Sequence, residues 1–494
     1  MKKFNMILLF LWFTMMASGQ YITPGTGVNW NLEQFVSNSG GIISFDGSVY
    51  DISGNITISA NDIISINEPV YFRVSSTVLI TVSGNLIITA QEPPVIFAST
   101  DQQNHFTGFK FQNSSGSNLS NVQFFRAGGI KLLSSNIEFN GCVFEEFNQS
   151  NCTGALDLSQ SSPLISSCGF IQNAGPAVLS SANGASSPQI INCIMDGNVT
   201  TNANMPQINL GTSATDSIRI VGNQIIGNPA LLQVGGIAIT TLVGGTLTAR
   251  IEGNLIKNNR YGMTQYGNNI GSVIRNNIIE DNNTQGLPNL GGSGINFFGN
   301  TTNQSYVSGN TITGNLWGIT IQNSAQPNFG QLDLGDLSPG MNQLFGNGNE
   351  GEIFDLYNNT PLTIWAQNND WGTMDIDSVE MHIFHQSDDP TLGIVHYLPL
   401  LDPTVSIHNF DSNPDRDNLH VLFPNPTTGF ISIQGLPEQK KMSLRLFSLN
   451  GELVRSIQTN MQKGDFDLSG LPPGFYFLVI QTPENSVARR IIIH

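Results

Sequence analysis

The sequence IVGNQIIGN at residues 220–228 returns as IEGNLIKNN at residues 251–259. In both copies an apolar residue comes three positions before an Asn, a second apolar residue comes two positions after it, and another Asn follows three later. Ten such units occur, and their central positions are Val122, Cys142, Cys168, Cys193, Asn223, Asn254, Asn277, Asn310, Asn342 and Asn369. Internal repetition at this period is typical of a solenoid.

The composition of the repeat predicts strands. The units are 20 to 33 residues apart, with Ile, Val and Phe at alternate positions and Asn and Gly between them, which leaves no room for helices. Equivalent residues would stack at the roughly 4.8 Å spacing of a parallel sheet. A position that accepts Val, Cys and Asn is internal, because a buried amide can hydrogen-bond to the amides above and below it. We therefore expect a right-handed parallel β-helix, all-β in class, with a ladder of stacked Asn.

The cysteines leave two possibilities open. Cys142, Cys168 and Cys193 occupy the ladder, where a free thiol behaves as a small apolar side chain. Their expected separation also lies within disulfide range, and an exported protein meets an oxidising environment. Cys152 lies off the ladder, and we place it in a loop.

Five segments follow from the pattern along the chain. Lys2 and Lys3, a short apolar run and the small residues Ala17, Ser18 and Gly19 are typical of a secretory signal peptide. Residues 419–494 hold short apolar runs separated by turns, which indicates a small antiparallel sandwich. The predicted segments are a signal peptide (1–19), an N-terminal cap (20–40), the β-helix (41–401), a polar linker (402–418) and the C-terminal unit (419–494).

The charge balance limits the partners. The chain has 494 residues, of which 11% are charged, and a net charge of −17. Nucleic acid is a poor partner for so acidic a protein. No apolar run approaches the roughly 20 residues that a membrane helix needs, so we expect no transmembrane segment. We also expect a monomer.

The C-terminal unit resembles a known family. The matching stretches are FPNPTTG at residues 423–429, GFYFLVI at residues 474–480 and RRIII at residues 489–493. In this order they are similar to the type A C-terminal sorting domain of the type IX secretion system. The resemblance implies a protein of the outer-membrane cell surface or the medium, with the type IX secretion machinery as partner. It assigns the sorting signal to Pro424, Asn425, Pro426, Gly429, Gly474 and Tyr476.

The body resembles the secreted right-handed β-helix repeat proteins with a pectin lyase-like fold that carry such tails. The resemblance rests on the repeated Asn phrase and on NNDWG at residues 368–372. That family includes polysaccharide lyases, hydrolases and proteins without known catalysis. The fold therefore fixes no reaction.

The sequence offers weak evidence for catalysis. A glycoside hydrolase needs two carboxyl groups on one face, and the Asn-Thr-Asp and Gly-Asp-Asp motifs of β-helix hydrolases do not occur in the sequence. A lyase needs a base and a cation near the sugar carboxylate. Lys257 lies three residues after Asn254, and Arg275 lies two residues before Asn277, so the two could share a face. A polysaccharide lyase that uses Lys257 and Arg275 on an acidic polysaccharide is thus one alternative.

The hypothesis we favour is that the protein binds a glycan or matrix component. Tyr261 and Trp317 each lie seven residues after a ladder Asn, in coils separated by one that carries Gln285. The two rings would stand two coils, roughly 10 Å, apart. With nearby amides such as Gln285 and Asn259, they would suit a neutral or cationic glycan. The sequence favours a non-catalytic protein for glycan or matrix adhesion, and a purely structural surface protein is the third possibility.

Metal ligands are few in the sequence. Asp370, Asp375 and Asp377 offer hard oxygen ligands suited to Ca²⁺. The spacing is common in proteins and is not specific for a metal. We expect no cofactor other than a possible structural Ca²⁺ held by these three residues.

Overall fold

The computed structural model describes residues 19–101, 103–349, 352 and 354–401, together with parts of the stretch from 421 to 493. The chain divides after Leu401 into two compact units. The predicted linker and all but the last residue of the predicted signal peptide lie outside the described residues.

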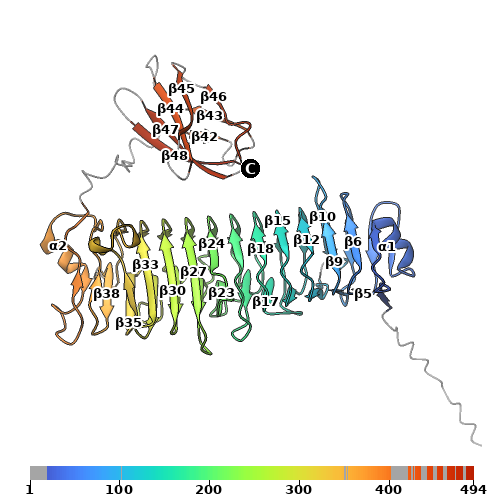
Figure 1. The fold of residues 1–494 in the computed structure, drawn as a ribbon, viewed down its shortest axis with the longest axis horizontal. Coiled ribbons are helices and arrows are strands. Elements are labelled where there is room, and N and C mark those ends of the chain that lie inside the picture. The colour runs from blue at the N-terminus through green and yellow to red at the C-terminus, as the bar shows by residue number, and fades with distance from the viewer. Residues whose placement is uncertain are drawn as a thin grey trace, which may run out of the picture. The chain divides into compact units, whose positions relative to one another are not determined.

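The first unit is a right-handed parallel β-helix, as predicted (Figure 1). Successive coils add strands to three long sheets, which we call sheets A, B and C. Sheet A contains β1 Gln20–Ile22, β5 Asn55–Ile58, β8 Leu79–Val82, β11 Gly108–Gln112, β14 Ile130–Leu133, β17 Leu156–Ser159, β20 Val178–Ser180, β23 Pro206–Leu210, β26 Gly235–Thr240, β29 Met263–Tyr266, β32 Ser293–Gly299, β35 Trp317–Asn323, β38 Leu356–Asn359 and β40 Ile383–Phe384.

Sheet B contains β2 Asn29–Asn31, β6 Ile63–Ile66, β9 Asn85–Ile88, β12 Asn118–Ser120, β15 Glu138–Asn140, β18 Leu164–Ser166, β21 Gln189–Ile191, β24 Ile218–Val221, β27 Leu247–Glu252, β30 Ile270–Arg275, β33 Asn303–Ser308, β36 Gln326–Asn328, β39 Ile364–Trp365 and β41 Val395–His396. Sheet C contains β3 Ile43–Phe45, β4 Tyr50–Ile52, β7 Tyr71–Val74, β10 Val95–Ser99, β13 Val122–Phe125, β16 Val143–Glu145, β19 Gly169–Ile171, β22 Ile194–Asp196, β25 Gln224–Ile226, β28 Leu255–Lys257, β31 Ile278–Glu280, β34 Thr311–Thr313 and β37 Gln343–Leu344. Three short helices accompany the sheets: α1 Leu32–Asn38, η1 Leu332–Leu337 and α2 Ile376–Met381.

The predicted Asn ladder forms the corner between sheets B and C. Its Asn side chains are at most 1% exposed. Each side-chain nitrogen donates to the side-chain oxygen of the Asn in the next coil at 2.8 to 2.9 Å, from Asn223 to Asn369. Each backbone nitrogen from Asn223 to Asn342 donates to the same oxygen. Cys142, Cys168 and Cys193 continue the column as buried free thiols.

A second buried ladder, which we did not predict, forms the corner between sheets C and A. Its side chains hydrogen-bond in sequence at 2.7 to 3.1 Å, and they are Asn173, Asn198, Gln207, Asn259, Asn282, Asn315, Asn347 and Asp355. In the coil where the repeat places Asn228, that side chain is exposed, and Gln207 bridges the gap to Asn259. The last Asn of the repeated phrase therefore also forms a structural column.

The second ladder ends at a contact between a carboxylate and an imidazole, which is an ion pair while His382 is protonated. Asp355 is fully buried, and its Oδ2 lies 2.9 Å from Nδ1 of His382, the residue that caps the C-terminus of α2. This contact with the carboxylate raises the pKa of His382. The terminal helix is thus tied electrostatically to the end of the amide column.

Apolar side chains fill the interior between the corners. One column of aromatic rings consists of Phe72, Phe97, Phe124, Phe144 and Phe170, whose centroids lie 4.6 to 5.7 Å apart. Adjacent rings are tilted by only 11°. Offset stacking of this kind adds to the stabilisation from burial.

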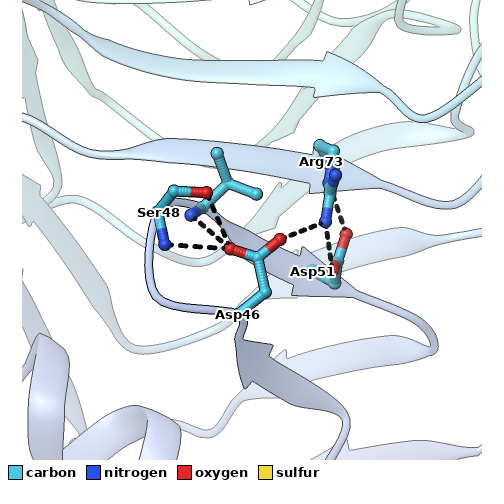
Figure 2. Close-up of polar contacts among 5 residues, drawn as sticks. Asp46, Ser48, Asp51 and Arg73 are labelled. Carbon is cyan, nitrogen blue, oxygen red and sulfur yellow. Dashed lines mark hydrogen bonds and ion pairs between the residues drawn. The ribbon is translucent and has the colours of Figure 1, made fainter.

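The N-terminal end is closed by α1 and a hairpin. Leu32 and Phe35 of α1 are buried against the first coils. The hairpin of β3 and β4 is antiparallel and is pinned to β7 by Arg73, which contacts Asp46 at 2.8 Å and Asp51 at 2.6 Å (Figure 2). Hydrogen bonds from the backbone of Val49 and from Ser48 lower the pKa of Asp46 to about 2. The closure covers a strand edge that would otherwise pair with other chains.

The second unit contains two antiparallel sheets, as predicted for a small sandwich. One consists of β42 Val421–Phe423, β43 Phe430–Gln434 and β46 Gly464–Asp467, and the other of β44 Met442–Ser448, β45 Leu453–Thr459, β47 Gly474–Gln481 and β48 Ser486–Ile493. Ile431 and Phe466 of the first sheet share one core with Leu446 and Leu478 of the second.

The ladder predicts the cost of removing one amide. In Asn277→Ala the backbone N–H and one side-chain N–H of Asn254 and the carbonyl of Ile251 lose buried partners. Each of these three unsatisfied groups costs about 1–3 kcal/mol, so the free energy of unfolding should fall by about 3–9 kcal/mol. Chemical denaturation measures this change. Gln304→Ala, on the exposed face of β33, is the control and should stay within about 0.5 kcal/mol of the wild type.

The His382–Asp355 pair predicts a pH dependence. Because the folded-state pKa of His382 is raised above 6.5, its stabilising contribution is fully present below pH 6.5 and is lost as pH rises through the raised value. Denaturation between acid and mildly alkaline pH should show this loss in the wild type and not in His382→Gln. His396→Gln, which changes the imidazole whose centroid lies 4.6 Å from that of the Trp365 ring, should keep this loss. An unchanged pH profile in His382→Gln would contradict the assignment.

Candidate functional site

The strands β29, β32 and β35 lie side by side in sheet A, and a polar strip crosses their outer side. In β29, β32 and β35, the residues at one aligned outward position are Thr264, Asn296 and Thr320. Asn296 donates to Thr264 at 2.9 Å and accepts from Thr320 at 2.8 Å. Their strand neighbours Met263, Ile295 and Ile319 are buried in the core. Period-2 alternation thus places a hydrogen-bonded row of side chains on the outer face of the sheet, where Thr264 and Asn296 are half-buried and Thr320 is 4% exposed.

Aromatic rings flank this strip. Tyr266 is 39% exposed, and its ring stacks on Phe298 with centroids 4.6 Å apart and planes 2° apart. On the other side of the strip lies the half-buried Trp317. The centroid of its ring is 5.5 Å from that of Phe354 and 5.3 Å from that of Tyr357. The strip therefore lies between flat apolar surfaces, which is typical of ligand sites that combine stacking with a few polar contacts.

A loop makes one wall of the site. Residues 283–292 leave the coil before β32, and Trp317 holds this loop through a 3.0 Å hydrogen bond from Nε1 to the carbonyl of Pro288. The hollow has a volume of about 670 Å³, and we call it the aromatic groove. Its lining residues are Asn204, Arg260, Tyr261, Thr264, Tyr266, Pro288, Asn289, Leu290, Gly291, Ser293, Asn296, Trp317, Thr320, Gln322, Tyr357 and Asn359. None of these described residues is Asp, Glu, His or Lys.

The structure brings Tyr261 and Trp317 to the same groove. They occupy aligned positions two coils apart, with Ser293 between them. The ring of Tyr261 covers Gly235, where a Cβ atom would lie only 2.1 Å from the ring. Burial raises the pKa of Tyr261 to about 12, so its phenol stays protonated at neutral pH.

Two residues expected beside these rings lie elsewhere. Gln285 lies in the 283–292 loop and does not line the groove, because that loop lengthens the coil and Ser293 takes the intervening place. Asn259 is 1% exposed. Its side-chain oxygen accepts from Gln207, and its side-chain nitrogen donates to Asn282 and to the carbonyl of Ile225 in the second ladder. The expected contribution of Asn259 to a surface site is therefore wrong, since its polar atoms hold the corner together.

Arg260 is the cation of the groove. Its Nη1 donates to Oδ1 of Asn204 at 2.5 Å, and its Nη2 donates to the carbonyl of Leu290. Its Nε is buried without a hydrogen-bond partner. From the sequence we considered Arg260 only as a cation close to Lys257 and Arg275 in the lyase alternative, and we did not connect it with Tyr261 and Trp317.

The residues proposed for a lyase lie on different faces. Lys257 belongs to sheet C, and its Nζ lies 3.6 Å from Oε1 of Glu280. Arg275 belongs to sheet B and donates to the carbonyls of Asp336 and Leu337 at 3.2 Å, which fastens η1. The Asn corner turns the chain between the two positions, so the expectation of a shared face is wrong. Catalysis by either residue stays a prediction.

The three carboxylates proposed for Ca²⁺ have local partners. Asp370 accepts from the backbone of Gly372, and Asp375 is the N-cap of α2 and accepts from Ser378. Asp377 lies in the first turn of that helix. In the part of the chain that the structure describes, no group of three His, Cys, Asp or Glu residues is placed to hold a metal. A structural Ca²⁺ stays a prediction.

The sorting residues lie in the second unit. Tyr476 is 7% exposed, and its hydroxyl donates to the carbonyl of Pro472 at 2.8 Å. Gly429 follows a turn in which its backbone N–H donates to Oγ1 of Thr427 at 3.2 Å, and Gly474 begins β47. Pro424, Asn425 and Pro426 lie outside the described residues.

Comparison with known proteins supports the assignment of the tail. Residues 421–494 match the family of secretion system C-terminal sorting domains. No curated protein matches the chain at a significant level. Among the described residues, no helix is both long and apolar enough to cross a bilayer. The chain is thus a β-helix protein that carries a type IX secretion sorting domain and is exported to the cell surface or the extracellular space.

Proposed function

We propose that this exported β-helix is a non-catalytic glycan-binding protein, acting in adhesion to polysaccharide or matrix, and that the aromatic groove is its binding site. The observation that carries the proposal is the juxtaposition of aromatic rings and a hydrogen-bonding strip in one groove. Export places this groove where extracellular polysaccharide is available.

The rings suit the apolar faces of sugars. A pyranose ring presents C–H groups on its faces, and these lose water when they pack against an aromatic ring. Tyr266 and Trp317 lie on opposite sides of the polar strip. Because both rings are packed against neighbouring aromatic side chains, little conformational entropy is lost when a ligand binds.

The polar strip suits the hydroxyl groups of sugars. Thr264, Asn296 and Thr320 already hydrogen-bond to one another, which fixes their orientation. Gln322 and Asn359 extend the polar lining on the next aligned row. Hydroxyl and amide groups can both donate and accept, as sugar hydroxyls do.

The ionisable groups of the groove favour binding over hydrolysis. Hydrolysis requires two carboxyl groups, and the described lining contains none. General acid and base catalysis at neutral pH needs a group that titrates near neutrality. The groove offers Arg260 and tyrosines, and burial raises the pKa values of Tyr261 and Tyr357 further.

Affinity electrophoresis of the purified exported protein through a panel of soluble polysaccharides tests the proposal. At least one polysaccharide should retard the wild type, and Trp317→Ala and Tyr266→Ala should each weaken binding by at least about tenfold, or 1.4 kcal/mol. Tyr306→Ala is the matched control, because Tyr306 is 38% exposed on sheet B and Tyr266 is 39% exposed on sheet A. The control should bind as the wild type does.

Two results would contradict the proposal. One is that no polysaccharide of the panel retards the wild type, which would favour a purely structural role. The other is that Tyr306→Ala weakens binding as much as Tyr266→Ala. The same incubations report on the lyase alternative, because a lyase produces an unsaturated sugar that absorbs in the ultraviolet. A rise in absorbance that Lys257→Ala abolishes would favour the lyase.

A further inference from the structure

The charge of the aromatic groove is opposite to that of the chain. The protein has 36 acidic and 19 basic residues, for a net charge of −17. Within the described lining of the groove, Arg260 is the one charged residue. A cation without a neighbouring carboxylate repels other cations and attracts anions, and the low-dielectric aromatic walls strengthen that effect.

The partners of Arg260 are all neutral. Its guanidinium donates to the side-chain amide of Asn204 and the backbone carbonyl of Leu290, and its Nε remains without a partner. Several other cations of the β-helix face carboxylates, as Arg73, Arg126, Arg250 and Lys257 do. No ion pair joins Arg260 to a carboxylate among the described residues. Burying part of a cation that has only neutral partners costs free energy unless an anion pairs with it.

The surrounding structure holds Arg260 in place. The residue before it, Asn259, is locked in the second ladder, and the residue after it, Tyr261, packs on Gly235. A Cβ atom at Gly291 would lie 2.9 Å from Nε of Arg260, so the loop approaches the guanidinium closely only because that position is Gly. The cation is therefore preorganised beside the rings before any ligand arrives.

We propose that the aromatic groove selects an anionic glycan, in which a carboxylate or sulfate group of a sugar pairs with Arg260 while neighbouring sugars stack on Tyr266 and Trp317. This inference rests on the proposed function and adds the charge of the ligand. Nε of Arg260 is buried, but Nη1 and Nη2 each carry a second N–H beyond the one given to Asn204 or Leu290, and charge-assisted hydrogen bonds from them to an anion are stronger than neutral ones. From the aromatic and amide residues alone we expected a neutral or cationic glycan. The position of Arg260 in the groove, which the sequence did not reveal, replaces that expectation with an anionic glycan.

Two matched pairs of polymers test the inference with the exported protein. Polygalacturonate is compared with its methyl ester, and dextran sulfate with dextran, so that only the charge differs within each pair. The wild type should bind the charged member of at least one pair at least about tenfold more tightly than the neutral member. A preference confined to the first pair identifies a carboxylate ligand, and one confined to the second identifies a sulfate ligand. The preference should weaken as salt rises, because salt screens the pairing.

Variants assign the preference to the groove. Arg260→Gln should abolish the preference and keep the weaker binding of neutral polymer, whereas Arg260→Lys should keep part of it. Arg219→Gln makes the same charge change at an exposed position of sheet B and should leave the preference intact. Circular dichroism and thermal unfolding check that each variant is folded. If Arg260→Gln does not fold, the comparison of Arg260→Lys with the wild type and the salt dependence carry the test.

The outcomes separate the two proposals. Equal binding of charged and neutral polymers, lost in Trp317→Ala, would overturn the anionic ligand and leave glycan binding in place. A preference that survives in Arg260→Gln would also overturn the role of Arg260. If no polymer of either pair or of the wider panel binds through Trp317, both proposals fail.

Discussion

The structure depends on buried amide hydrogen bonds that pass from coil to coil. A coil of this β-helix turns its backbone at corners inside the molecule, where water cannot satisfy the peptide groups. The side-chain oxygen of a ladder Asn such as Asn254 accepts from the side chain and the backbone N–H of the Asn before it, and its side-chain nitrogen donates to the next Asn and to a backbone carbonyl. Because the same side chain both donates and accepts hydrogen bonds, the ladder continues through every coil in which the sequence supplies an Asn at this position.

The two ladders constrain different corners and leave the rest of each coil free. The corner between sheets B and C takes the central Asn of the repeat, and the corner between sheets C and A takes the last. Where the amide is missing, a thiol or Gln207 fills the column. Insertions are therefore tolerated as long as the ladder residues keep their hydrogen bonds, as Asn282 does beside the loop that follows it. The 283–292 loop is such an insertion, and it makes a wall of the aromatic groove beside strands that stay in register.

Function and stability thus use neighbouring residues for different purposes. In the run from Asn259 to Tyr261, the first side chain points into the corner, and the next two line the groove. The rigid corner fixes the backbone from which the side chains of Arg260 and Tyr261 extend, which a flexible loop would not do. A binding site built in this way is held by hydrogen bonds that no ligand touches.

The sequence alone determined the β-helix, the Asn ladder and the sorting tail, because the repeat and the terminal motifs are local and periodic. It also placed Tyr261 and Trp317 two coils apart. It did not place Gln285 correctly between Tyr261 and Trp317, because loop lengths vary. It also did not separate Lys257 from Arg275, because each corner turns the next residues to another face. Only the tertiary structure gathered Tyr266, Asn296, Thr320 and Tyr357 around Arg260. Those residues come from four coils, and their proximity depends on strand register and on one loop, neither of which appears as a pattern in the chain.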